Sequence, residues 1–131
     1  MKEIEELIKL AEYNHSLDLQ RGEKNYLSLE WALDQIKAEV DEVKAELKPH
    51  NIPYIEDELS DILWSFFMGI EKFRYEGYEV SVQRVIKRAL KKYQERVLPL
   101  KGNKEQDKII WQRVKKQQKE ALQKEKKILN S

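Results

Sequence analysis

The sequence predicts an all-α fold, an antiparallel four-helix-type bundle with an extra C-terminal helix. No stretch of the 131 residues alternates apolar and polar side chains over the length of a strand. Apolar residues instead recur every three or four positions, as one face of a helix requires. The prolines, and every glycine except Gly69, fall between these periodic segments, at positions 22, 49, 53, 77, 99 and 102. These breaks divide the chain into about five helices.

The first two predicted helices span residues 2–17 and 28–48, with a loop around Gly22 between them. The second begins near Ser28, whose hydroxyl suits an N-cap, and ends before Pro49. Its apolar positions lie alternately four and three residues apart, the spacing of a bundle seam. They are Leu29, Leu33, Ile36, Val40, Val43 and Leu47.

The third predicted helix begins near Pro53, a residue favoured in a first turn, and ends at Gly77. Its broad apolar face predicts burial on two sides, by its own bundle or by a second subunit. The fourth covers residues 80–97, and a polar fifth helix covers residues 103–131. We therefore expect a helical catalytic domain over residues 1–100 and a polar helical extension over residues 101–131.

Composition narrows the functional class. The net charge of +1 gives no overall field that would attract nucleic acid or an acidic partner. The chain has no cysteine, which excludes disulfides, zinc–thiolate sites and thiol catalysis. The N-terminus is too polar for a signal peptide, and no apolar run is long enough to span a bilayer. We therefore expect a soluble cytoplasmic protein.

Two acidic pairs, Glu39/Glu42 and Glu58/Asp61, flank the break at residues 49–53. Within each pair the carboxylates are three residues apart and share one helix face. At about 1.5 Å per residue, each pair lies roughly 8 to 14 Å from the turn. In an antiparallel hairpin, Glu42 then faces Glu58 and Glu39 faces Asp61. Four unpaired carboxylates in one place repel one another, and a hard divalent cation that prefers oxygen ligands relieves the repulsion.

The same pairs also fit a simpler interpretation, namely a solvated helix face. The chain holds 24 acidic residues, and Glu3/Glu6 and Glu76/Glu79 repeat the spacing. Three lysines on the second helix also offer neutralising partners for its carboxylates. They are Lys37, Lys44 and Lys48.

The acidic segment resembles the signature of the MazG-like, all-α NTP pyrophosphohydrolase superfamily. It reads EVDE from Glu39 to Glu42, then fifteen residues, then ELSD from Glu58 to Asp61, followed by the apolar ILWSFF. Downstream, KYQER resembles the family's lysine–aromatic–x–x–arginine stretch that contacts substrate phosphates. One departure is Ala38, which stands where many relatives carry a further glutamate.

The resemblance implies hydrolysis of a nucleoside triphosphate to a nucleoside monophosphate and pyrophosphate. It implies a Mg²⁺ site, with Mn²⁺ as a possible substitute, held by Glu39, Glu42, Glu58 and Asp61. It also implies phosphate binding by Lys92 and Arg96. Glu39 is our candidate for the general base, and Ala38 leaves that assignment open because the usual extra carboxylate is missing.

The resemblance further implies assembly into a homodimer or homotetramer. Asn14 and His15 lie where this family often closes the pocket for the base, whereas a lone histidine at a helix end is more often a capping residue. Trp31 and Trp64 suit base stacking or the core. The alternative to an enzyme is a non-catalytic helical interaction module, with a basic-tail nucleic-acid binder as a weaker third hypothesis. The preferred nucleotide and the number of metal ions are not encoded in any of these patterns.

Overall fold

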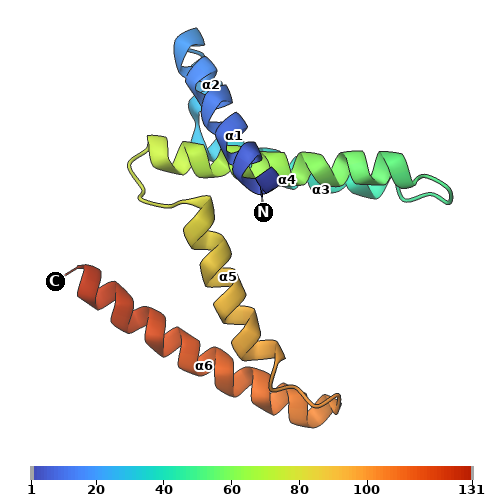
Figure 1. Ribbon diagram of the computed structural model, residues 1–131, viewed down its shortest axis with the longest axis vertical. Coiled ribbons are helices and arrows are strands. Elements are labelled where there is room, and N and C mark those ends of the chain that lie inside the picture. Colours follow the sequence, from blue (N-terminus) through green and yellow to red (C-terminus); the bar gives the residue numbers. More distant parts are fainter. Residues whose placement is uncertain (1, 131) are drawn as a thin grey trace. The chain divides into compact units, whose positions relative to one another are not determined.

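The computed structural model describes residues 2–130, and over these residues the chain is built from helices without strands (Figure 1). This confirms the predicted all-α class. The helices are α1 (Lys2–Arg21), α2 (Lys24–Leu27), α3 (Leu29–Ala45), α4 (Ile52–Tyr75), α5 (Val82–Val97) and α6 (Lys104–Leu129). Within the described residues, none of the helices combines the length and the apolar character that crossing a membrane requires.

The chain forms two compact units. The first extends to Val82 and contains α1 to α4, and the second begins at Gln83 and contains α6 with nearly all of α5. The structure thus groups α5 with α6, whereas the sequence places a functional boundary after residue 100. That functional division stays a prediction.

Helices α3 and α4 form the antiparallel pair on which the first unit is built (Figure 1). Ser28 is the N-cap of α3, as predicted, and its hydroxyl accepts a hydrogen bond from the Trp31 amide at 3.2 Å. Pro53 lies in the first turn of α4, where its missing N–H costs no hydrogen bond. In the turn between them, the Asn51 side-chain amide donates to the backbone and side-chain oxygens of Glu46, each at 2.8 Å.

Two details of the N-terminal region differ from the prediction. Helix α1 continues to Arg21 instead of ending at Leu17, and it stops at Gly22, which adopts the left-handed backbone with φ +66°. The predicted loop after Gly22 contains the single-turn helix α2. Such a short helix has no apolar periodicity by which a sequence pattern can reveal it.

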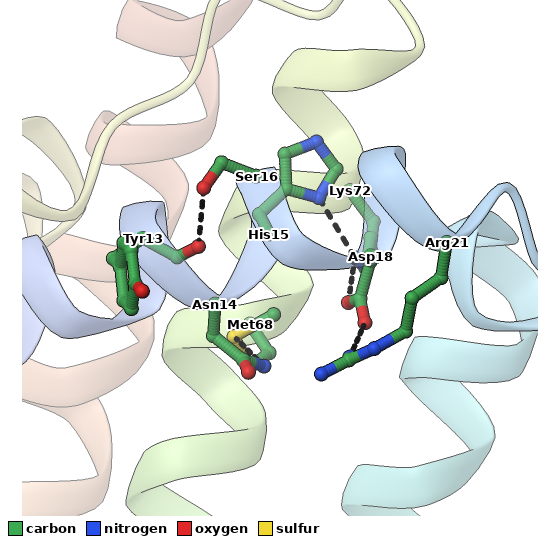
Figure 2. A network of polar contacts seen from close by, with 8 residues as sticks. All are labelled: Tyr13, Asn14, His15, Ser16, Asp18, Arg21, Met68 and Lys72. Atoms are coloured by element: carbon green, nitrogen blue, oxygen red, sulfur yellow. Dashed lines mark hydrogen bonds and ion pairs between the residues drawn. The ribbon is translucent and has the colours of Figure 1, made fainter.

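Helix α1 packs on α4 through an apolar seam that ends in a buried polar network, and Figure 2 shows this network. Ile8 and Ala11 are buried, and the same three-and-four spacing continues to His15 and Asp18, which are also buried. Lys72 of α4, only 1% exposed, donates to Asp18 Oδ2 at 2.9 Å and lies 2.7 Å from His15 Nδ1.

Burial, and secondly the charge of Lys72, lower the pKa of His15. A lowered pKa keeps the imidazole neutral, so that Nδ1 is able to accept a hydrogen bond from the lysine ammonium. The buried ammonium is therefore satisfied by a carboxylate and a neutral imidazole, both from α1. This network ties α1 to α4.

The apolar core of the described residues is small. It consists of Ile8, Ala11, Ala32, Phe67, Ile70 and Val82. Many large apolar side chains of α3, α4 and α5 remain exposed, among them Leu33, Val40, Leu59, Leu63, Ile86 and Leu90. Single exposed apolar residues are ordinary, but this number on one small chain is typical of surfaces that meet another protein.

The second unit is a helical hairpin held by polar contacts. Asp107 closes the turn between α5 and α6, because its carboxylate accepts hydrogen bonds from the amides of Lys101 at 2.7 Å and Gly102 at 2.9 Å. Further along, Arg88 of α5 forms an ion pair with Glu125 of α6 at 2.8 Å. Both partners of this pair are about half exposed, so it contributes little to stability.

Candidate metal centre

The α3–α4 pair brings together Glu39, Glu58 and Asp61. Each of these residues offers a carboxylate oxygen, and the three oxygens lie within 4.8 Å of one another. Glu39 comes from α3, whereas Glu58 and Asp61 come from α4, one turn apart on one face. Three of the four carboxylates that the sequence singled out therefore converge.

The fourth carboxylate, Glu42, is not part of this close group. Its charge nevertheless acts on the group, because it helps to raise the pKa of both Glu39 and Glu58. Glu42 thus lies within electrostatic range of the three converging oxygens. Glu42 is therefore a neighbour of the three carboxylates and not a member of the close group.

Mutual repulsion makes the group electrostatically unfavourable. Burial and the charges of Asp61 and Glu42 raise the pKa of Glu39. Partial burial, then Asp61 and Glu42, also raise the pKa of Glu58. Both shifts have the direction expected of carboxylates that share one site without a counter-charge.

Among the described residues of the first unit, no basic side chain forms an ion pair with the group. The ion pairs of the described residues involve other carboxylates, namely those of Asp18, Glu71 and Glu125. Lys37, Lys44 and Lys48, which the simpler interpretation uses as partners, form no ion pair there. The acidic pairs are therefore not explained by ordinary salt bridges along α3.

The donor set fits a hard divalent cation. All three converging atoms are carboxylate oxygens, the ligand type that Mg²⁺ and Mn²⁺ prefer, and no sulfur or imidazole ligand belongs to the group. Two oxygens on one Mg²⁺ lie at most about 4.2 Å apart, since Mg²⁺–oxygen distances are about 2.1 Å, so these oxygens, within 4.8 Å of one another, reach one ion after small side-chain movements. The Glu/Glu/Asp group is thus able to bind a metal ion.

Lys92 and Arg96, the predicted phosphate contacts, lie on α5 in the second unit. Both cations lie near one aromatic ring, that of Tyr93, with Lys92 Nζ at 5.6 Å and Arg96 Cζ at 5.7 Å from its centroid. Arg96 also lies 5.4 Å from the Trp111 ring of α6, and its Nε donates to Gln118 Oε1 at 2.8 Å. The two basic side chains are therefore held by a set of contacts within the second unit.

The other residues considered for substrate binding contact neighbouring side chains. The Asn14 amide contacts the sulfur of Met68 at 3.6 Å, and His15 belongs to the buried network with Lys72 (Figure 2). The Trp31 ring meets Tyr26 edge-on at 5.0 Å, beside an open pocket at the start of α3. These contacts give no indication of a ligand.

Sequence reasoning missed two sets of residues. The first set is Lys72, His15 and Asp18. Lys72 is a lone cation within an apolar helix face, and His15 and Asp18 continue the seam of Ile8 and Ala11. These polar residues at apolar positions were a signal of the buried network. The second is Gln118, for which the sequence gives no signal, because one glutamine in a polar helix does not differ from its neighbours.

A comparison with protein families gives one finding. A family model described as the MazG nucleotide pyrophosphohydrolase domain matches residues 27–98. The match covers more than half of the chain and contains both acidic pairs as well as Lys92 and Arg96. Searches of curated proteins and of solved structures gave no match.

The electrostatics of the metal centre generate a stability prediction. Raised carboxylate pKa values mean that repulsion lowers stability near neutral pH and that protonation relieves this repulsion as the pH falls through the folded-state values. We expect Asp61→Asn, in metal-free buffer at pH 7.5, to raise the melting temperature by about 2 °C, measured by circular dichroism. The gain should shrink as the pH approaches 5.

Glu56→Gln is the matched control, because Glu56 is an exposed carboxylate of the same helix outside the converging group. It should leave the melting temperature unchanged. If Asp61→Asn lowers the melting temperature in the absence of metal, repulsion does not dominate this site.

Proposed function

The chain belongs to the MazG nucleotide pyrophosphohydrolase domain family, and we propose that it is a Mg²⁺-dependent enzyme that converts a nucleoside triphosphate and water into a nucleoside monophosphate and pyrophosphate. Family membership indicates the broader class, a hydrolase of nucleotide phosphoanhydrides. The observation that carries the finer proposal is the convergence of Glu39, Glu58 and Asp61 without a neutralising cation among the described residues.

The carboxylates would hold the metal ion, with Glu42 as the fourth acidic residue of the site. A bound Mg²⁺ supplies charge neutralisation of the phosphates and makes a water molecule more nucleophilic. Mn²⁺ meets the same requirements, since it also prefers oxygen ligands. Two of the proposed ligands, Glu39 and Glu58, are only partly buried, so an ion has access to them from solvent.

Glu39 is the group that we propose as proton acceptor for the attacking water. It is only partly exposed, and burial together with Asp61 and Glu42 raises its pKa above that of an ordinary glutamate. Its carboxylate belongs to the group that would hold the ion, so a water bound to that ion would lie within its reach. Ala38 stands where many relatives carry a further glutamate, so the chain lacks that extra carboxylate beside Glu39.

Lys92 and Arg96 are proposed to bind the phosphates of the substrate and of the departing pyrophosphate. They lie four residues apart on α5 and thus on one helix face. A guanidinium is able to bind phosphate oxygens through two parallel hydrogen bonds, whereas an ammonium acts as a point charge. Both stabilise the negative charge that develops on the leaving pyrophosphate.

Pyrophosphate release from a panel of common and modified nucleoside triphosphates tests this proposal. With Mg²⁺ or Mn²⁺, the wild-type chain should release pyrophosphate from at least one of them. Glu58→Gln and Asp61→Asn should each lower kcat/KM by about 100-fold or more, because the remaining ligands no longer hold the ion and its charge correctly.

Glu56→Gln should retain full activity, and all variants should keep their helical circular dichroism. A wild-type chain that releases no pyrophosphate from any nucleotide of the panel would contradict the proposal. That result would favour the alternative, a non-catalytic helical interaction module.

We also propose that the chain assembles into a homodimer or homotetramer. The supporting observation is the small core of the described residues beside exposed apolar side chains of α3 and α4, among them Val40, Leu59 and Leu63. Covering such surface is favourable by about 25 cal/mol per Å². The cytoplasmic location stays a prediction from the sequence.

The oligomeric state is measurable directly. Multi-angle light scattering should give the mass of two or four chains, each of 15.7 kDa, because the apolar faces of the chain are then covered. The mass should persist on dilution into the low-micromolar range. A compact species with the mass of a single chain contradicts the assembly and leaves the catalytic proposal to stand on its own test.

A further inference from the structure

We propose that Gln118 of the C-terminal helix α6 is a positioning residue for phosphate binding, acting through Arg96. The inference rests on the proposed phosphate role of Lys92 and Arg96. Gln118 lies outside the matched family domain, which ends at residue 98. It would extend the functional machinery into a helix that the sequence presents as a polar extension.

The side-chain amide of Gln118 binds one turn of α5 through both its oxygen and its nitrogen. Its Oε1 accepts a hydrogen bond from Arg96 Nε at 2.8 Å. Its Nε2 donates to the backbone oxygen of Lys92 at 3.0 Å and to Glu95 Oε1 at 2.9 Å. One amide from α6 therefore fixes the turn of α5 that carries both proposed phosphate ligands.

These contacts orient the Arg96 guanidinium without using its terminal nitrogens. Nε is bound by Gln118, and the rings of Trp111 and Tyr93 lie 5.4 Å and 5.7 Å from Cζ. Within residues 2–130, no acceptor binds Nη1 or Nη2 of this arginine. The two terminal amino groups are thus left for a bidentate acceptor such as a phosphate.

Gln118 also binds the carboxylate of Glu95, an anion that neighbours these cations on α5. Glu95 lies beside Arg96 in sequence and three residues after Lys92, a spacing that favours ion pairs on a helix. In the part of the chain that the structure describes, Glu95 forms no ion pair, and its carboxylate accepts a hydrogen bond from Gln118 instead. Neither Lys92 nor Arg96 is thus paired with a carboxylate within the described residues.

Fixing the guanidinium before the ligand arrives raises affinity. A free arginine side chain loses rotamer freedom when it binds phosphate, and this entropic cost opposes binding. The amide of Gln118 and the two aromatic rings remove most of that freedom in advance. Loss of Gln118 should thus weaken phosphate binding more than it affects the chemical step.

The test uses the full-length chain and inorganic pyrophosphate as the probe. Gln118→Leu keeps the size of the side chain and removes its three hydrogen bonds. We expect it to raise the dissociation constant of pyrophosphate about tenfold in titration calorimetry, the effect expected for a hydrogen bond to a charged group. KM of the nucleotide substrate should rise by a similar factor, and kcat should fall by a smaller factor, because Arg96 would also stabilise the charge that develops on the leaving pyrophosphate.

Gln117→Leu is the matched control, because Gln117 is the preceding residue of α6 and its side chain is exposed. It should bind pyrophosphate as the wild type does. In a chain that already carries Arg96→Ala, Gln118→Leu should have no additional effect, since a positioning residue acts only through the group that it positions.

Each outcome decides a separate question. If the wild type neither binds nor releases pyrophosphate, the proposed function and this inference both fail. If the wild type is active and Gln118→Leu binds pyrophosphate as tightly as Gln117→Leu does, the inference alone is wrong. An equal loss with and without Arg96 also overturns it, because Gln118 then supports the fold in general.

Discussion

The repulsion among the carboxylates of Glu39, Glu58 and Asp61 is the constraint on which the account of this protein depends. Helices α3 and α4 hold these side chains with oxygens within 4.8 Å of one another. Burial and mutual charge raise the pKa of Glu39 and Glu58, and within residues 2–130 no basic side chain forms an ion pair with the group. A hard divalent cation bound to these carboxylates would relieve their repulsion and stabilise the fold.

Helix α4 also carries a buried charge that is part of the fold. Lys72 of α4 is fully buried, yet its ammonium is satisfied by Asp18 and by a neutral His15 of α1 (Figure 2). A buried charge with its partners in place is compatible with a stable fold, whereas an unpartnered one is costly. Helix α4 thus carries one internally satisfied cation and two acids, Glu58 and Asp61, that form no ion pair within the described residues.

Much of this arrangement was predictable from the sequence. Ser28 and Pro53 mark the starts of α3 and α4 through local chemistry, namely N-capping and a fixed backbone angle. Equal distances from the turn at residues 49–53 then predicted that acidic pairs on the two helices converge. These inferences succeed because they need only the helix geometry and one short turn. The exclusion of Glu42 from the closest group depends on side-chain geometry that equal spacing along two helices does not specify.

Other features depend on contacts that no local pattern encodes. The grouping of α5 with α6, the burial of Lys72 and the hydrogen bonds of Gln118 each arise between residues far apart in the chain. From the sequence alone, a polar side chain is expected to face solvent. Its hydrogen-bond partner is determined only by how the helices pack. The contacts between α6 and Arg96 are therefore a feature that the structure shows and the sequence does not.

Binding of Mn²⁺ to the metal-free protein, followed by electron paramagnetic resonance, tests the central claim most directly. We expect saturable binding at neutral pH that Glu58→Gln and Asp61→Asn each weaken at least about tenfold, since every lost carboxylate removes a ligand and a charge. Glu56→Gln, on the same helix, should bind Mn²⁺ as the wild type does. Equal Mn²⁺ binding by the wild type and by Asp61→Asn would contradict the claim that this group is a metal centre.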